Sequence, residues 1–246
     1  MILRQFLHSD PVGISYIFGC GGHATGAVVD PLAGIDTYML AAQATGMRIS
    51  YVFDTHIHAD HISTGPELAD ATGAAYVLSA AADVEVPFLG VEEGDEIQLG
   101  NVVVKILHTP GHTPEHICLL ATDRTRADEP WFVATGHTLM IGDLGRTELA
   151  VSAAKGAADL FRSVQKLKAL PEYLQVLPGA YAGSVCGRSL SGNPVSTIGF
   201  EKRHNKAFRI DNETDFVSFM LNDIPPAPPE AARIRAINSG RARATP

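Results

Sequence analysis

Four side chains of the types that bind metal ions lie within six positions of this sequence, directly after the apolar run 49–53. These residues are His56, His58, Asp60 and His61. Burying imidazole and carboxylate groups costs free energy unless each finds a partner, and a single cation can satisfy several of them. The segment is therefore predicted to form a metal-binding loop at the end of a strand, where functional sites are commonly built.

Two later segments have a similar form, in which an apolar run ends in a turn and a histidine. Residues 107–116 contain a Pro-Gly turn that presents His112, and residues 133–137 end in His137. Such a turn fixes the backbone while the imidazole projects from it. We therefore expect three strand ends to converge on one point. Two other histidines of the segment 107–116 could be hydrogen-bond partners of the ligands or merely polar loop residues: His108 and His116.

The elements that must position these residues follow from the hydropathy pattern. Short apolar or alternating runs, most of them bounded by Gly, Pro or Asp, are typical of strands: 13–19, 27–29, 49–53, 75–78, 102–108, 117–121 and 131–135. Stretches with helical character lie between some of these runs or follow them: 35–45, 63–72 and 155–170. Strands with helices between them and no clean linker predict a layered α/β sandwich in one domain.

A compositional break occurs near the end of the chain. Residues 224–229 are rich in proline, which stiffens the backbone, and they precede a short Ala/Arg-rich segment at 230–236. We therefore interpret residues 1–222 as the folded domain and residues 223–246 as a Pro-rich C-terminal arm.

Composition and charge narrow the class of function. The 246 residues are 46% hydrophobic, enough for a sizeable core, and the formal net charge is −8. This balance, without a Lys/Arg cluster, argues against nucleic acid or an anionic membrane surface as a partner. No apolar run approaches the roughly 20 residues that cross a bilayer, and residues 1–20 show no export signal. A soluble, cytoplasmic protein with reduced cysteines and a small-molecule substrate is expected.

The segment His56-Ile57-His58-Ala59-Asp60-His61 resembles the HxHxDH signature of the metallo-β-lactamase superfamily. Thr-Pro-Gly-His112 and Thr-Gly-His137 match its next two ligand positions in order, and the resemblance covers residues from about 16 to about 209. It implies an α/β (α+β) fold, the αββα four-layer sandwich. Within the superfamily, three segments are most similar to the persulfide dioxygenase branch, close to glyoxalase II: 135–139, 145–149 and 196–203.

Two positions depart from the pattern of members with two metals. His137 stands where those members have an Asp that bridges the metals, and Ala180 stands where they have a further His. A neutral imidazole offers one lone pair and cannot bridge, so a second metal would be left with Asp60 and His61. We therefore predict one metal ion per chain. The resemblance implies that it is held by His56, His112 and His137.

The identity of this ion depends on the same departure. Persulfide dioxygenases use one iron held by two His and one carboxylate, which favours Fe(II), while three histidines around an open site also suit Zn(II). His58 would be a fourth ligand of zinc or a hydrogen-bond donor beside iron.

Candidate substrate residues lie in two segments. Residues 179–188 resemble the Gly-Ala-Gly-Ser-x-Cys-Gly segment of sulfur-handling members, which implies that Cys186 accepts or positions a sulfane sulfur. Its thiolate would be favoured if Arg188 lowers the pKa, and the alternative is a small buried Cys. Arg146 could bind a substrate carboxylate such as that of glutathione, or form a surface salt bridge. Tyr181 could donate its hydroxyl hydrogen to substrate.

Three functions remain open at this point. The first is a persulfide dioxygenase, which would act on glutathione persulfide with O₂. The second is a glyoxalase II-like zinc hydrolase of thioesters or lactones, in which Asp60 serves as base. The third is a degenerate, non-catalytic member that binds sulfur through Cys186. A homodimer is left open.

Overall fold

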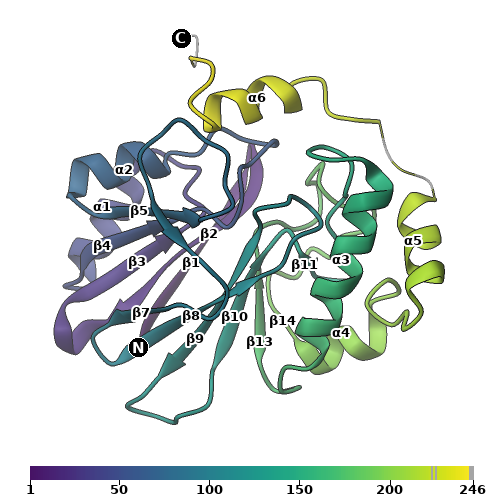
Figure 1. Cartoon of the computed structure of the whole chain (residues 1–246). Coiled ribbons are helices and arrows are strands. Elements are labelled where there is room, and N and C mark those ends of the chain that lie inside the picture. The colour runs from purple at the N-terminus through teal and green to yellow at the C-terminus, as the bar shows by residue number, and fades with distance from the viewer. Residues whose placement is uncertain (223, 225, 244–246) are drawn as a thin grey trace.

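Two six-stranded sheets form the centre of the computed structural model, which describes residues 1–222, 224 and 226–243 (Figure 1). The first sheet has the order β1-β2-β3-β4-β5-β6. Its strands are β1 (Ile2–Ser9), β2 (Val12–Cys20), β3 (Thr25–Val29), β4 (Arg48–Phe53), β5 (Ala75–Ser79) and β6 (Leu89–Val91). The pairs β1/β2 and β2/β3 are antiparallel, and the pairs from β3 to β6 are parallel. The carboxyl ends of β3, β4 and β5 therefore lie at one edge of this sheet.

The second sheet has the order β14-β13-β10-β9-β8-β7. Its strands are β7 (Glu96–Leu99), β8 (Val102–His108), β9 (Ile117–Asp123), β10 (Phe132–Gly136), β13 (Gln175–Pro178) and β14 (Ser196–Thr197). The pair β10/β13 is parallel and the other pairs are antiparallel. A small ribbon follows β10 and consists of β11 (Leu139–Met140) and β12 (Asp143–Leu144).

An apolar core lies between the two sheets, because alternate residues of their strands point inward. In this core Phe18 of β2 meets Phe132 of β10 edge to face, with ring centroids 5.3 Å apart. A fully buried side chain of this size contributes about 1.5–3 kcal/mol to folding. Packing across both inner faces therefore fixes the sheets, and with them the strand ends, relative to one another.

Helices cover the outer face of each sheet and complete four layers. Helices α1 (Ile35–Ala44) and α2 (Gly65–Thr72) bury Tyr38 and Leu68 against the first sheet. The second sheet is covered by α3 (Ala153–Lys168) and α4 (Ile198–His204), and α5 (Glu213–Leu221) packs against α3. Helix α3 buries Leu160, Val164 and Leu167, whose spacing places them on one stripe. The predicted αββα sandwich is confirmed.

The C-terminal arm includes a short helix, α6 (Ala231–Asn238). It lies across the loops at one end of the sandwich, away from α5 (Figure 1). Of the predicted arm 223–246, residues 223, 225 and 244–246 lie outside the described residues. Among the described residues, the remaining helical element is the short 3₁₀ helix η1 (Gly21–His23). None of the helices in the described part of the chain is long and apolar enough to span a membrane.

Candidate metal centre

Three histidines from three separate strand ends meet at the edge of the sandwich. His56 follows β4, His112 lies between β8 and β9, and His137 follows β10. One ring nitrogen of each can be chosen so that all lie within 4.8 Å of one another. The ring centroid of His56 is 4.8 Å from that of His112 and 4.7 Å from that of His137. All three side chains are buried. The three predicted strand ends therefore do converge.

The backbone at Gly136 allows this close approach. Its φ is +48°, in the left-handed region that favours glycine. A Cβ atom at this position would lie 2.5 Å from Thr55 Oγ1 and 2.6 Å from His116 Nε2. Only a residue without a side chain can therefore carry His137 to this place.

The hydrogen-bond partners of two histidines determine which nitrogen of each ring carries the lone pair that a cation needs. Thr55 Oγ1 donates its hydrogen to Asp30 Oδ2 at 2.9 Å, so it can only accept from His56 Nδ1, also at 2.9 Å. The Nδ1 of His112 donates to the carbonyl of Arg146 at 2.7 Å. The proton of each ring is therefore assigned to Nδ1, and Nε2 carries the lone pair. This is how histidine ligands are oriented in metal sites.

The unsatisfied polar atoms fit a cation at this place. His56 Nε2 and His137 Nε2 are buried and make no hydrogen bond within the described residues. Burial, followed by the neighbouring His137, lowers the pKa of His112 to about 3. Burial lowers the pKa of His137 to about 4, although the charge of Asp60 raises it. Burial also lowers the pKa of His56 well below its ordinary value. Neutral imidazoles are the form of histidine that binds metals, so the donor set suits a metal ion.

A second group joins His58, Asp60 and His61, whose candidate ligand atoms lie within 4.8 Å of one another. His61 Nδ1 is 3.3 Å from Asp60 Oδ1. Burial opposes ionisation of Asp60, but the adjacent His61 and His137 rings lower its pKa well below the ordinary value. Neither carboxylate oxygen of Asp60 has a hydrogen-bond partner among the described residues. This carboxylate is thus an ionised acceptor beside the three histidines.

His58 differs from the other histidines because it faces carboxylates. Its Nε2 is 3.2 Å from Asp30 Oδ1 and 3.8 Å from Asp54 Oδ1. Although burial lowers the pKa of His58, the charge of Asp30 and a hydrogen bond to it raise the pKa well above its usual range. A protonated ring donates from both nitrogens and offers no lone pair. Of the two expected roles for His58, this geometry favours the hydrogen-bond donor.

Asp30 is a functional residue that the sequence analysis missed. It accepts hydrogen bonds from the backbone N–H of Thr55 at 2.7 Å and from the hydroxyl of Thr55, besides facing His58. It therefore orients both His56, through Thr55, and His58. The available signal was its place directly after the apolar run 27–29, the same strand-end position that pointed to His56.

His116 and His108, whose roles the sequence left open, have different surroundings in the structure. His116 is buried, stacks on His56 with ring centroids 5.0 Å apart, and accepts from the backbone N–H of His137 at 3.1 Å. It therefore holds the backbone of a candidate ligand. His108 is only half-buried, and its Nε2 lies 3.0 Å from the carbonyl of Pro114. It is the last residue of β8 and contacts the turn that follows.

Arg146 does not present its guanidinium to a ligand in this structure. The group forms an ion pair with Glu148 and donates to the carbonyls of Val185 at 3.1 Å and Pro226 at 3.3 Å. The side chain is also buried, so it is not a surface salt bridge. The surface salt bridge is therefore not what the structure has, whereas binding of a substrate carboxylate by Arg146 stays a prediction. Its contribution to the site is the backbone carbonyl that accepts from His112.

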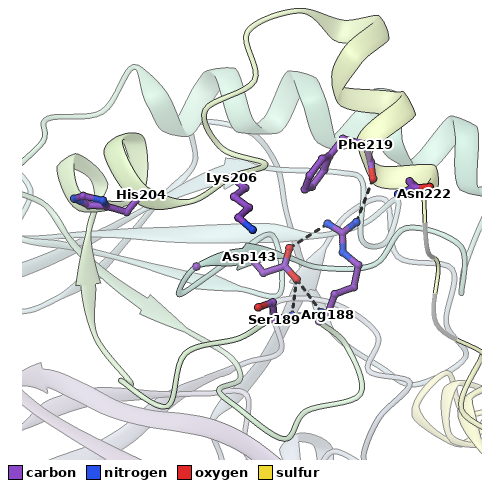
Figure 2. Close-up of a pocket in the computed structure, with 9 residues that line it drawn as sticks. Asp143, Arg188, Ser189, His204, Lys206, Phe219 and Asn222 are labelled. Atoms are coloured by element: carbon purple, nitrogen blue, oxygen red, sulfur yellow. Dashed lines mark hydrogen bonds and ion pairs between the residues drawn. The ribbon is translucent and has the colours of Figure 1, made fainter.

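Arg188 lines a pocket together with Asp143 and Phe219. Its guanidinium pairs with Asp143 at 3.1 Å and lies 4.9 Å from the centre of the Phe219 ring (Figure 2). This pocket has a volume of about 700 Å³. Because Arg188 is directed to Asp143, the structure gives no support to activation of Cys186 by this residue.

Cys186 is a buried thiol beside the metal-binding side chains. Burial, and then the charge of Asp60, raise the pKa of Cys186 well above its ordinary value, so the thiol is protonated. Its Sγ forms a group with Asp60 and His137 in which the candidate ligand atoms lie within 4.8 Å of one another. Sequence analysis left two alternatives open, a thiolate favoured by Arg188 and a small buried Cys, and the structure has a buried, neutral thiol close to His137.

The remaining two positions of the segment 179–188 are Tyr181 and Ala180. The hydroxyl of Tyr181 donates to the carbonyl of His8 at 2.9 Å and joins the 178–184 segment to β1. Donation from this hydroxyl to a substrate stays a prediction. Ala180 is fully buried and offers no ligand atom.

The sequence model of the Metallo-beta-lactamase superfamily matches residues 12–179 of this chain. The chain belongs to this superfamily. A metallo-beta-lactamase of Staphylococcus aureus has a similar crystal structure, with a TM-score of 0.93 and 34% identity, covering 98% of this chain and 73% of that one. The match extends beyond the sandwich to nearly the whole chain.

Relatives in two branches of the superfamily are similar in sequence. The mitochondrial persulfide dioxygenase ETHE1 of Homo sapiens is 29% identical over 234 residues, which are 93% of this chain and 84% of that protein. The hydroxyacylglutathione hydrolase of Methylococcus capsulatus is 33% identical over 159 residues, 63% of this chain and 57% of that protein. Homologues of both kinds are metal-dependent enzymes, and the histidine and aspartate cluster supports a metal ion in this member of the superfamily too.

Proposed function

We propose that this chain holds one metal ion through His56, His112 and His137 and oxidises a persulfide, such as glutathione persulfide, with O₂. The observation that carries the proposal is the buried triad of neutral imidazoles, whose ligand atoms lie within 4.8 Å of one another. Similarity to a persulfide dioxygenase over 93% of the chain supports the choice of reaction. An Fe(II) ion in such a set would supply redox chemistry and open coordination positions for the reactants.

The side chains around the triad orient its ligands. The Asp30–Thr55 pair fixes the tautomer of His56, and the Arg146 carbonyl fixes that of His112. His116 holds the backbone N–H of His137. Partners outside the ligand set typically change metal affinity or activity by about 10- to 100-fold, so these contacts are part of the proposed site.

The overall reaction is balanced without a further reductant. One persulfide, one O₂ and one water give one thiol, one sulfite and two protons. The terminal sulfur of the persulfide is oxidised and leaves as sulfite, and O₂ is reduced. In this scheme the neutral thiol of Cys186, close to His137, contacts the substrate sulfur and positions it, because a protonated thiol is a poor nucleophile.

A specific observation also favours a second candidate, a zinc hydrolase of thioesters. Three neutral histidines with no carboxylate among them match the zinc set of some hydrolytic enzymes, and a hydroxyacylglutathione hydrolase is among the relatives. In that case the ionised carboxylate of Asp60, whose Oδ2 lies 3.9 Å from His137 Nε2, serves as the base.

One experiment separates the two candidates. Protein purified without added metal is analysed for iron and zinc, and then supplied with glutathione persulfide while oxygen uptake and sulfite are measured. The proposal expects iron and one O₂ consumed per sulfite formed. Zinc with cleavage of an acylglutathione thioester, and no oxygen uptake after reconstitution with Fe(II), would instead establish the hydrolase.

A matched pair of variants ties either activity to the triad. His112→Ala removes a proposed ligand, whereas His108→Ala removes a half-buried histidine of the same segment that lies against Pro114. Loss of metal and turnover in the first variant alone is expected. Full activity of His112→Ala would contradict the proposed ligand set.

A further inference from the structure

The C-terminal arm contacts the loop that carries the candidate metal ligands. Helix α6 lies across the loops at this end of the sandwich, far in sequence from everything it covers (Figure 1). We propose that α6 is a clasp that positions the metal loop, residues 56–63, with Asn238 and Arg235 as its positioning residues. The inference rests on the proposed function only in requiring a metal ion at this loop.

Asn238 binds three backbone groups of the metal loop with one side chain. Its Nδ2 donates to the carbonyl of His58 at 2.9 Å and to the carbonyl of His61 at 2.8 Å. Its Oδ1 accepts from the backbone N–H of Ser63 at 3.0 Å. Both amide hydrogens and the oxygen are therefore engaged on the segment that carries Asp60 and His61.

Arg235 holds the other end of the same loop together with Glu115. Arg235 Nη1 donates to the carbonyl of Ile57 at 2.8 Å and lies 3.4 Å from Glu115 Oε1. Glu115 is buried, and its Oε1 accepts from the backbone N–H of Ile57 at 2.9 Å. The peptide groups on both sides of Ile57, between His56 and His58, are thus fixed by this ion pair.

The loop needs such partners because it has no regular secondary structure. Residues 54–64 belong to neither a helix nor a strand, and most of their side chains are buried. Buried backbone N–H and C=O groups cost free energy when unpaired, so an irregular buried loop depends on side chains from elsewhere. Here α6 supplies these side chains, which lie about 180 positions after the loop in the sequence.

The arm also reaches the support of a second ligand. Before α6, the carbonyl of Pro226 accepts from the guanidinium of Arg146 at 3.3 Å, and the carbonyl of Arg146 accepts from His112. After α6, the carbonyl of Ser239 accepts from the backbone N–H of Glu85 at 2.8 Å. The arm is therefore attached both before and after α6, and its release would free the loops around His56 and His112 together.

The test measures metal retention in the full-length chain. Asn238→Asp keeps the size of the side chain and one acceptor, but it replaces the two donated hydrogens by an oxygen that repels the His58 and His61 carbonyls. Zinc-loaded protein is titrated with a chromophoric chelator. We expect zinc affinity to fall by about tenfold or more, as for other groups outside a ligand set. Zinc affinity equal to that of the unmodified chain would overturn the inference.

Arg233→Ala is the matched control, since Arg233 lies on the same helix and pairs with Glu230 at the exposed surface. It should leave zinc affinity unchanged. An equal loss in Arg233→Ala and Asn238→Asp would show that any disturbance of α6 weakens binding, and would contradict specific positioning by Asn238.

A second measurement separates positioning from general support of the fold. A merely structural contact lowers the melting temperature of metal-free and zinc-loaded protein equally, whereas a positioning contact reduces the rise in melting temperature that zinc produces. If Asn238→Asp does not fold, Arg235→Lys is measured in the same way, because lysine keeps the charge but not the forked geometry. If Asn238→Asp weakens zinc binding as expected, but the unmodified chain reconstituted with Fe(II) oxidises no persulfide, the proposed function fails and this inference stands.

Discussion

His56 and His58 are separated by one residue, yet their surroundings give them opposite properties. His56 lies among the imidazoles of His58, His112, His116 and His137. Burial, followed by the charges of these neighbours, lowers the pKa of His56 well below its ordinary value. The ring of His58 is only 4.1 Å from that of His56, but it faces Asp30 and Asp54, and its pKa is raised. One short motif thus contains a neutral ring suited to bind a metal and a charged ring suited to hold carboxylates in place.

The comparison separates residues that bind the metal from residues that stabilise the loop. Removal of a neutral metal-binding side chain such as His56 should mainly lower the metal content. Removal of a member of the charged group, His58 with Asp30 and Asp54, should mainly lower the free energy of unfolding, because it leaves a buried charge without its partner.

The largest expected effect is on metal content. His56→Ala removes a proposed ligand, and we expect the purified variant to retain almost no metal after dialysis, a larger loss than the roughly 10- to 100-fold of an indirect partner. Elemental analysis measures this. His23→Ala, at an exposed histidine, is the control and should keep the full metal content. Retention of one equivalent by His56→Ala would remove His56 from the ligand set.

Asp30→Asn tests the charged group. The change keeps the shape of the side chain but leaves the charge of His58 less compensated, and breaking a buried ion pair costs about 3–5 kcal/mol. Urea unfolding of the metal-free protein measures the free energy of unfolding. Asp36→Asn replaces an exposed carboxylate on α1 and should change it little. A loss below about 1 kcal/mol in Asp30→Asn would mean that His58 is neutral in the folded chain.

His116→Phe tests an intermediate case, a neutral ring that contacts a ligand without facing the metal. Phenylalanine keeps the stacking on His56 but cannot accept from the backbone N–H of His137. A buried donor left unpaired costs about 1–3 kcal/mol, and metal affinity should fall by about tenfold. Unfolding in urea and chelator titration give the two values. Unchanged zinc affinity would show that His137 needs no such support.

The sequence predicted those features whose residues are close together in the chain. The strand ends that carry His56, His112 and His137 were recognisable because an apolar run, a turn and a ligand-type side chain are adjacent in the chain. The side chains that orient these segments could not be recognised in the sequence. Asn238 reaches His58 across 180 positions, and such a pairing leaves no mark on the local pattern.

Two other differences have a similar physical origin. Strand β1 was not predicted because it lies at the sheet edge, where its residues are half-buried or exposed and polar side chains interrupt the apolar run. The direction of Arg188 was missed because its partner Asp143 lies 45 positions away. Side chains that choose between several partners are settled by tertiary packing, whereas the fold class follows from the overall pattern of strands and helices.

The smallest effect separates two histidines of a single segment. His108→Ala removes a side chain that is half-buried and lies 3.0 Å from the carbonyl of Pro114, at the far end of the turn from His116. A hydrogen bond of this kind contributes about 0.5–1.5 kcal/mol, so the free energy of unfolding should fall by that amount at most. Zinc affinity should not change, since His108 contacts none of the triad's partners named above. A drop in zinc affinity comparable to that of His116→Phe would mean that His108 and His116 both support the ligands, and the distinction drawn between these two histidines would be wrong.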